Sequence, residues 1–482
     1  TPIKSSAASD VYKRQSQYRQ EQVQEKLSQL GIFSYMDMQY APRDTTAACD
    51  TLDVTMQATF AKPLDAELEL NVVTKSNDQT GPGASFGVTR NNVFGGGESW
   101  NVKLKGSYEW QTGGGEKSSL MNSWEMGLST SLTFPRVVFP HLGKREFDFP
   151  ATTTFRLYIN QLNRAKYYKL LSFGGNATYD FQPSRTSRHS ITPFKLTFNV
   201  LQHQSEDFKE IAEANPALYV SLRNQFIPAM EYTYTYDNAS GRRIKNPIWW
   251  QSTVTSAGNI TSLIYRAFGK PFNEEDKSLL GAPFAQFVKL NTELRHLWNI
   301  DKNNAIASRM AVGALFTYGN ATIAPYSEQF YVGGANSIRA FTVRSVGPGG
   351  YHPEEGKYSY LDQTGTFRFE ANVEYRFRIF KSFWGATFLD AGNVWLLRKD
   401  RKLLADGKEA RPNSQLRLKT FPKQIALGTG VGIRYDMDIL VFRLDFGIPL
   451  HLPYDTERSG YYNVTGAFFK NLGIHFAIGY PF

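Results

Sequence analysis

Arg339 lies in a glycine-rich, apolar stretch of the chain, YVGGANSIRAFTVRSVGPGG at residues 331–350. Apolar residues such as Ile338 and Phe341 are unfavourable in contact with external water. The stretch is compatible with a surface loop, but we favour a loop near 325–350 that folds back into an interior and carries Arg339 with it. Such a loop needs tight reversals, which are permitted by Gly333, Gly334, Gly347, Gly349 and Gly350.

The chemistry open to Arg339 is ion pairing. Three acidic residues follow the loop, namely Glu370 and Glu374 in TFRFEANVEYRFRIF and Asp390 in FLDAGNVW. A guanidinium and a carboxylate bind each other strongly when their hydrogen bonds are charge-assisted and aligned. We therefore expect Arg339 to pair with one of them on an inner wall, and we count Arg376 of the same segment among the wall partners of the loop. Room for the loop would come from wall positions without side chains, in LGTGVGIRY at Gly428, Gly430 and Gly432.

Residue types that carry catalysis are sparse. Seven histidines are present, of which His189, His203 and His475 lie near or within predicted strands, and none falls in a recognisable catalytic constellation. Cys49 is the single cysteine, so neither a disulfide framework nor a cysteine metal cluster can form. The sequence therefore predicts no enzyme, no cofactor and no metal site.

The formal net charge of +10 leaves nucleic acid, anionic lipid and a charged pore open as partners. No P-loop, zinc-finger spacing or recognition helix is present, and the basic residues are spread among strands and loops. We predict no nucleic-acid binding. No window approaches the roughly 18 apolar residues that a membrane-spanning helix needs.

The elements that must position these residues are strands. In ILVFRLDFGIPL, large apolar residues alternate with Arg443 and Asp445, and NLGIHFAIGYPF at the chain end repeats the alternation. A period of two is the pattern of a strand with one apolar face. Sixteen such segments begin near residues 67, 84, 99, 123, 152, 167, 189, 225, 247, 284, 304, 366, 383, 425, 439 and 471.

A sheet with an apolar face and a charged face is typical of an outer-membrane barrel, with the apolar face towards lipid and the charged face towards a wet lumen. Closure would also satisfy every strand edge. We therefore predict an all-β fold, a 16-stranded antiparallel transmembrane β-barrel over residues 64–482. Long and short connectors alternate, which predicts periplasmic chain ends. Phe482 would close the barrel against lipid and the aromatic girdle.

Residues 1–63 follow another pattern. Residues 1–15 match nothing in the rest of the chain and are expected to be non-native or disordered, with the true N-terminal part missing. YRQEQVQEKLSQLG predicts a helix that ends at Gly31, and IFSYMDMQYAP and LDVTMQATF predict two strands. Residues 16–63 are therefore predicted to form a partial α/β module.

The segment from about 325 to 482 resembles the C-terminal half of the BamA/TamA superfamily of outer-membrane assembly barrels. That family has a loop motif of Val or Ile, Arg, Gly and an aromatic residue, a Glu-x-Arg strand and a Phe-x-Asp-x-Gly strand. The three motifs are matched here by Ile338, Arg339, Ala340 and Phe341, by Glu374 and Arg376, and by Phe388, Asp390 and Gly392.

The resemblance implies that Arg339 reaches into the lumen and pairs with Asp390. Ala340 departs from the family pattern, and because alanine tolerates positive φ poorly we expect a different backbone or mild strain there. RNNVFGGGE looks more like the TamA-like branch than BamA itself. Residues 16–63 are similar to the latter part of a periplasmic transport-associated (POTRA) repeat.

The first and last predicted strands would meet at a seam. Pro481 cannot donate to a strand ladder, which by itself indicates either a weak seam or simply a strand end. With the resemblance added, we favour a seam that opens sideways and offers strand edges to an incoming chain. Its residues are Leu68, Leu70 and Val72 on the first strand, and Gly473, Ile474, Gly479, Pro481 and Phe482 on the last.

The resemblance implies an outer-membrane factor that inserts or exports substrate proteins, located in the bacterial outer membrane with its N-terminal repeat in the periplasm. The implied partners are outer-membrane lipids, unfolded outer-membrane proteins and periplasmic assembly partners bound through the repeat. The alternative is an FhaC-like two-partner secretion pore for one dedicated passenger. A plain porin would not need the preceding repeat.

Overall fold

The computed structural model describes residues 23–482 with internal gaps, so the expectations for residues 1–15 and for Cys49 lie outside the described residues. Among the described helices, none is long and apolar enough to cross a membrane. The gaps are residues 25–26, 29, 44–51, 75–78, 112–122, 140–150, 165–167, 207–208, 210–223, 240–243, 274–276, 280–281, 321–323, 354–361, 400–408, 410 and 438–439.

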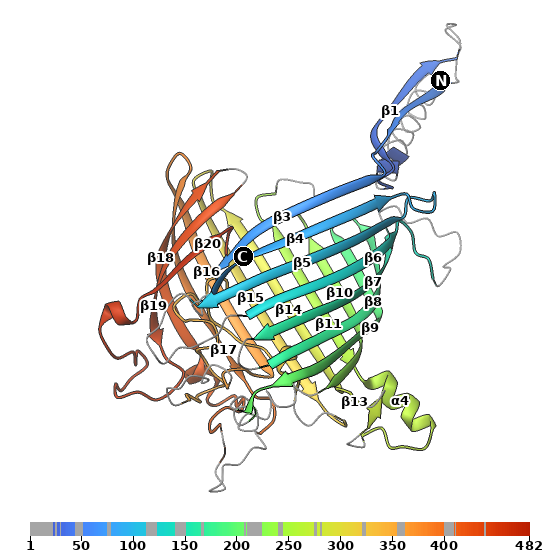
Figure 1. Ribbon diagram of the computed structural model, residues 1–482. Coiled ribbons are helices and arrows are strands. Elements are labelled where there is room, and N and C mark those ends of the chain that lie inside the picture. Colours follow the sequence, from blue (N-terminus) through green and yellow to red (C-terminus); the bar gives the residue numbers. More distant parts are fainter. Residues whose placement is uncertain are drawn as a thin grey trace, which may run out of the picture.

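Sixteen antiparallel strands form one continuous, strongly curved sheet in which neighbours in sequence are neighbours in space (Figure 1). This confirms the predicted strand number. The strands are β3 Leu64–Thr74, β4 Gln79–Asn91, β5 Ser99–Gln111, β6 Ser123–Phe134, β7 Ala151–Arg164, β8 Tyr168–Ser184, β9 Ser187–Gln204, β10 Gln225–Asp237, β11 Ile248–Ala257, β14 Phe287–Asn299, β15 Asn304–Thr317, β16 Phe367–Phe380, β17 Phe383–Trp395, β18 Ala426–Asp436, β19 Val441–His451 and β20 Gly473–Ile478.

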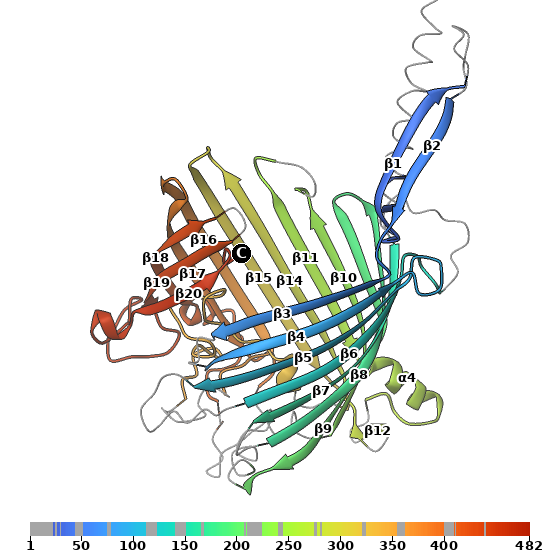
Figure 2. The ribbon, with the colours of Figure 1, turned by 45° about the horizontal axis from the view of Figure 1, so that its top comes forward.

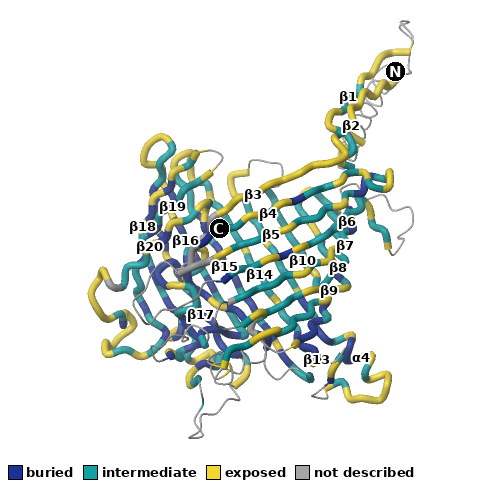
Figure 3. The backbone as a smooth tube through the Cα atoms, viewed as in Figure 1, coloured by how far each residue is buried: buried dark blue, intermediate teal, exposed yellow. Residues whose placement is uncertain are grey.

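The outer face of the sheet is apolar because side chains alternate between faces along every strand. One register row of exposed side chains crosses six strands without a polar residue. Buried residues gather instead in the C-terminal half of the sheet, around β16, β17 and β18 (Figure 3). The exposed row consists of Leu68, Phe86, Leu104, Leu128, Ile159 and Phe173.

The two ends of the sheet, β3 and β20, are not joined by a strand ladder in the described residues, so the predicted closure is not observed. The reason lies in β20, which has only six residues instead of the predicted twelve. Gly479 has a φ of 88°, which breaks the alternation. The chain then turns inward, and Phe482 lines an inner pocket of about 140 Å³ beside Trp249 and Arg376. The predicted contact of Phe482 with lipid and the aromatic girdle was therefore wrong.

Near the C-terminus, long connectors lie at one end of the sheet and short turns at the other, as the sequence predicted. The long ones near the C-terminus are residues 318–366, 396–425 and 452–472, and the turns between them are residues 381–382 and 437–440.

Smaller elements surround the sheet. The hairpin of β1 (Phe33–Pro42) and β2 (Leu52–Phe60) projects away from it (Figure 2) and follows residues 23–24 and 27–28, which are helical. The connector between β11 and β14 contains helix α4 (Asn259–Ala267) and a short hairpin of β12 (Ser278–Leu279) and β13 (Ala282–Pro283). Three single 3-10 turns are η1 Tyr326–Glu328, η3 Phe421–Gln424 and η4 Phe468–Lys470.

If the outer face contacts lipid, a charge will be tolerated on one face of β6 only. Leu128→Arg is expected to lower the free energy of unfolding in lipid vesicles by roughly 2–4 kcal/mol, the cost of arginine near a bilayer midplane. Ser129→Arg places the same charge one residue on, on the inner face, and should cost far less. Urea titration followed by tryptophan fluorescence measures both variants, and equal losses would contradict a lipid-facing exterior.

Candidate functional site

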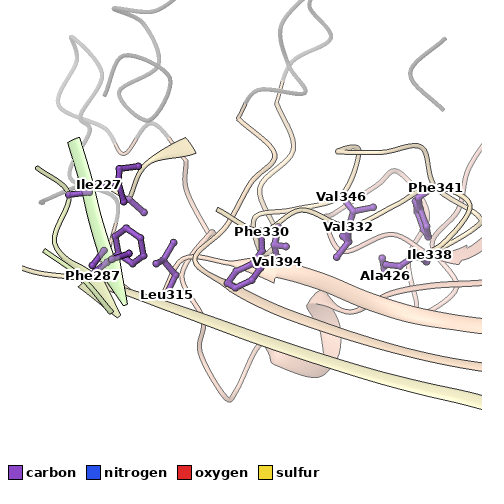
Figure 4. Close-up of a cluster of buried hydrophobic side chains, with 14 of the residues drawn as sticks. Ile227, Phe287, Leu315, Phe330, Val332, Ile338, Phe341, Val346, Val394 and Ala426 are labelled. Carbon is purple, nitrogen blue, oxygen red and sulfur yellow. The ribbon is translucent and has the colours of Figure 1, made fainter. Parts of the chain in front are cut away.

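The connector between β15 and β16 folds against the inner face of the sheet rather than projecting from its end. Ile338 and Phe341 are buried, and they share one apolar cluster with Val394 of β17 and Ala426 of β18 (Figure 4). Burial of an apolar side chain of this size stabilises by roughly 1.5–3 kcal/mol. The apolar residues that would be unfavourable on a surface loop therefore hold this loop on the wall.

The loop backbone requires Gly333, whose φ is 102° and whose missing Cβ would lie 2.0 Å from the carbonyl oxygen of Thr342. Ala340 is not among the described residues with positive φ, and the left-handed non-glycine residue of this loop is Arg344, with a φ of 57°. The strain expected at Ala340 does not occur, because the left-handed conformation falls elsewhere in the loop.

Arg339 lies at the centre of the contact between loop and wall and is completely buried. Its Nε donates to Asp390 Oδ2 at 2.8 Å, its Nη2 donates to Asp390 Oδ1 at 2.9 Å, and its backbone N–H donates to Oδ2 at 3.0 Å. Its Nη1 donates to Glu374. The guanidinium also stacks 3.5 Å above the ring of Phe388. Every face of the buried cation therefore meets a carboxylate or an aromatic ring.

Arg339 keeps its positive charge in spite of its burial. Desolvation alone would lower the pKa of the guanidinium, but the hydrogen bond with Asp390 and the surrounding carboxylates raise this pKa above its ordinary value. The guanidinium therefore stays protonated at any ordinary pH.

Two neighbouring strands position the wall side chains. Asn372 of β16 is paired in register with Asp390 of β17, and Glu374 with Phe388, so the four side chains form one inward patch. The Asn372 amide donates to Asp390 Oδ1 at 2.9 Å and fixes that carboxylate. Gly392 is required nearby because a Cβ there would lie 2.5 Å from the carbonyl oxygen of Phe369.

Glu370 binds the loop, but not through Arg339. Its carboxylate accepts a hydrogen bond from Ser337 Oγ at 2.6 Å and forms ion pairs with Arg309 and Arg368 at 3.1 and 3.2 Å. Arg376, expected to be another partner of the loop, instead donates to Glu374 at 2.7 Å. Its guanidinium packs on the rings of the C-terminal Tyr480 and Phe482.

Sequence reasoning missed the part of the cluster that β18 and β19 supply. Arg434 donates to Glu374 Oε2 at 3.1 Å and contacts Asp445 at 2.6 Å, and both are fully buried. Arg443 donates to the loop residue Asn336 at 2.7 Å. The signal was available, since Arg443 and Asp445 occupy the polar positions of a period-two strand, but the pattern does not say which lumen residues meet.

Glycines make room for the loop at three places. A Cβ at Gly428 would lie 2.3 Å from that of Ala340, and Cβ atoms at Gly447 and Gly473 would lie 2.6 and 3.1 Å from the carbonyl oxygen of Arg339. Gly430 and Gly432, which were also expected to accommodate the loop, instead clear space for the wall side chains Phe388, Arg434 and Asp445.

The last strand is attached to the loop by His475, which sequence reasoning did not place in the site. Its Nε2 lies 2.7 Å from the carbonyl oxygen of Arg339. Because a carbonyl can only accept, His475 carries the proton on Nε2 and donates it. Of the remaining seam residues, Ile474 of β20 points outward and is 60% exposed, and Pro481, which follows the end of β20, is buried. On the first strand, Leu68 and Leu70 are exposed, whereas the side chain of Val72 lies outside the described residues.

The loop and wall form a buried, charge-paired latch: the loop is fixed in one position while its pairs are intact, and breaking one pair leaves a charge without a partner in a dry environment. Such a latch can couple the loop to the strands that it touches.

Arg339→Ala is expected to lower the free energy of unfolding by roughly 3–5 kcal/mol, because Asp390 and Glu374 would remain buried without their cation. Arg378→Ala on β16 is the matched control. That exposed guanidinium donates to the carbonyl of Lys381 at 2.8 Å, away from the buried cluster, so its loss should cost about 1 kcal/mol or less. Urea titration in vesicles measures both, and similar losses would show that Arg339 is not central.

His475→Leu should loosen β20, because the carbonyl of Arg339 would lose a buried donor worth roughly 1–3 kcal/mol. Hydrogen exchange of the amides of residues 473–478 would become faster, and His475→Gln, which retains an N–H donor, should restore part of the protection. The exposed His203→Leu on β9 serves as control. Unchanged exchange in β20 would mean that its pairing with β19 alone holds it.

Comparison with known proteins agrees with this architecture. The Omp85 superfamily domain matches residues 92–482. BamA from Haemophilus ducreyi lacking POTRA domains 1–3 superposes with a TM-score of 0.58 at 14% identity, over 94% of this chain and 76% of that one. CdiB from Acinetobacter baumannii gives a TM-score of 0.48 at 12% identity, over 89% of this chain and 64% of that one, and CdiB from Escherichia coli gives 0.44 at 12%, over 90% and 67%. The chain belongs to the Omp85 superfamily.

Proposed function

We propose that this protein is an outer-membrane barrel that inserts or exports substrate proteins through a lateral seam, meaning the unpaired edges of β3 and β20. The proposal rests on the pairing of β20 with its neighbours in the sheet. This strand pairs with β19 at six positions and with no other strand among the described residues. Two strand edges are therefore left with free backbone donors and acceptors.

A free edge can template an incoming strand by main-chain hydrogen bonding, and alternate side chains then fix the register. An edge inside lipid is costly, because its backbone groups have no water to bind. A substrate strand that pairs with the edge removes this cost. The substrate's own folding into lipid would supply the free energy, so on this proposal the chain needs no cofactor and is not an enzyme.

The latch gives the seam a way to be controlled. β20 is held on one side by β19 and from the inside by the contact of His475 with the loop at Arg339. A substrate that displaced the loop would remove this inner attachment and free β20 to move. Movement of the loop and opening of the seam would then be two parts of one event.

The partners proposed are outer-membrane lipids on the apolar face, unfolded outer-membrane proteins at the seam, and periplasmic assembly partners at residues 16–63. Two assignments remain predictions: that of those residues to a periplasmic POTRA repeat, and that of the chain to the TamA-like branch. The β1–β2 hairpin is compatible with the strand pair of such a repeat.

A secretion pore for a dedicated passenger is the second candidate, and the inner face of the N-terminal strands favours it. Lys103 with Glu69, and Lys105 with Glu125, form ion pairs in which each side chain is at least one third exposed. Exposed charges on this side of the sheet suit a water-filled path, whereas assembly at the seam does not require one.

Photo-crosslinking in cells separates the two functions. Probes in the full-length protein would stand at Leu70 and Ile474 on the seam, at Arg368 on the inner face, and at the exposed Leu294 of β14 as a control remote from the seam. Assembly predicts that several nascent barrel proteins crosslink at both seam positions and not at Leu294. Capture of one secreted passenger from Arg368 alone would overturn assembly and establish a dedicated export pore.

A further inference from the structure

Helix α4 is the longest described helix, and it stands at the end of the sheet that carries the long connectors. It begins directly after β11, at Gly258, whose left-handed φ of 70° turns the chain out of the strand. No side chain fits at this turn, because a Cβ would lie 2.3 Å from the carbonyl oxygen of Ala285. In Figures 1 and 2 the helix projects sideways from the sheet rather than over its opening.

One face of α4 is packed on the protein. Ser262 is completely buried and accepts a hydrogen bond from the buried Lys277 at 3.1 Å. Tyr265 donates to the carbonyl of Ser278 and lies 6.0 Å from the ring of Phe284, and Asn259 accepts a hydrogen bond from Tyr318 at 2.8 Å. These contacts fix how the helix is rotated about its axis.

The opposite face of α4 is apolar and uncovered. Ile260, Leu263 and Ile264 recur at helical spacing, and Phe268 continues the row as the C-cap residue. They are 46%, 55%, 52% and 84% exposed, respectively. A nine-residue helix that hides Ser262 and shows its isoleucines is inverted with respect to an ordinary surface helix.

The outer face of the sheet indicates what covers this row. Val254 of β11, Leu290 of β14 and Phe316 of β15 are exposed on the outer face of the sheet where the helix joins it, so the apolar row continues from a surface that is already apolar. Arg266 and Lys270 are exposed at the C-terminal end of α4, where cations can reach lipid phosphates. The acidic residues 274–276 lie outside the described residues, so the proposal depends on the apolar row.

We propose that α4 is an interfacial anchor whose apolar row inserts into the lipid leaflet on the long-connector side of the sheet, next to the barrel wall. An amphipathic helix of this type lies in the plane of the interface. The proposal rests on the membrane location given under Proposed function. It adds that β11 and β14, which stand near the middle of the sheet and several strands away from either edge of the seam, are tied to the membrane surface. The anchored side would stay at fixed depth while β3 and β20 move.

A fluorescent label in the full chain tests the anchor. Leu263→Cys in a Cys49→Ser background would carry an environment-sensitive label in phosphatidylethanolamine–phosphatidylglycerol vesicles whose acyl chains are brominated. Leu128→Cys on the outer face is the positive control, and Ser278→Cys, exposed in the same connector, is the water-facing control. Quenching at Leu263 and Leu128 but not at Ser278 is expected.

Each other outcome has a separate meaning. Quenching at Leu128 without quenching at Leu263 overturns the anchor and leaves the barrel in the membrane. No quenching at either position contradicts the membrane location itself. A shielded label at Leu263 that bromine does not quench, and that becomes exposed on dilution of the protein, assigns the row to a second copy of the chain and overturns the lipid anchor.

A second set of variants tests the apolar row, with the label at Phe268→Cys. Leu263→Ser is expected to lower the equilibrium constant for lipid contact by roughly tenfold or more, the effect of removing one buried leucine side chain. Arg266→Ser, at the edge of the row, should lower it by about fivefold at most. An equal effect of both would mean that charge rather than the apolar row holds the helix, which also overturns the proposal.

Discussion

A buried guanidinium must be paired, and the inner architecture of this protein follows from that constraint at Arg339. Asp390 and Glu374 supply the carboxylates, Phe388 supplies a ring, and the loop can occupy only the position in which all of them meet. Ion pairs of this kind add little net stability when compared with a well-packed apolar core. Their value lies in specificity, because a displaced loop would leave charges without partners.

The same constraint reaches the end of the chain. The carbonyl of Arg339 accepts from His475, and Gly447 and Gly473 let the backbone of the loop approach β19 and β20. Arg376, which helps to neutralise Glu374, packs on Tyr480 and Phe482 and holds the tail inside. Among the described residues, the outer edges of β3 and β20 pair with no further strand, which is the feature on which the proposed function depends.

Much of this was visible in the sequence, and the failures have physical causes. The period of two located all sixteen strands because each strand separates an apolar face from a polar one. The period of two also predicted that β20 continues to Phe482. Apolar and small or polar residues still alternate after Gly479, although the backbone turns at Gly479. His475 was considered only as a catalytic residue, because its partner is a backbone carbonyl of another segment, which no pattern of side chains reveals.

The sequence by itself determined the strand number, the apolar exterior and the loop that carries Arg339, because these depend on local alternation and on residue type. Only the tertiary structure decided that Arg434, Asp445 and His475 join the cluster, that β3 and β20 stay apart, and that α4 turns its apolar row outward. These features depend on register, on rotation about a helix axis and on contacts between segments more than a hundred residues apart, such as His475 with Arg339. Local sequence does not encode these contacts between distant segments, because they form only when the whole sheet has curved around the loop.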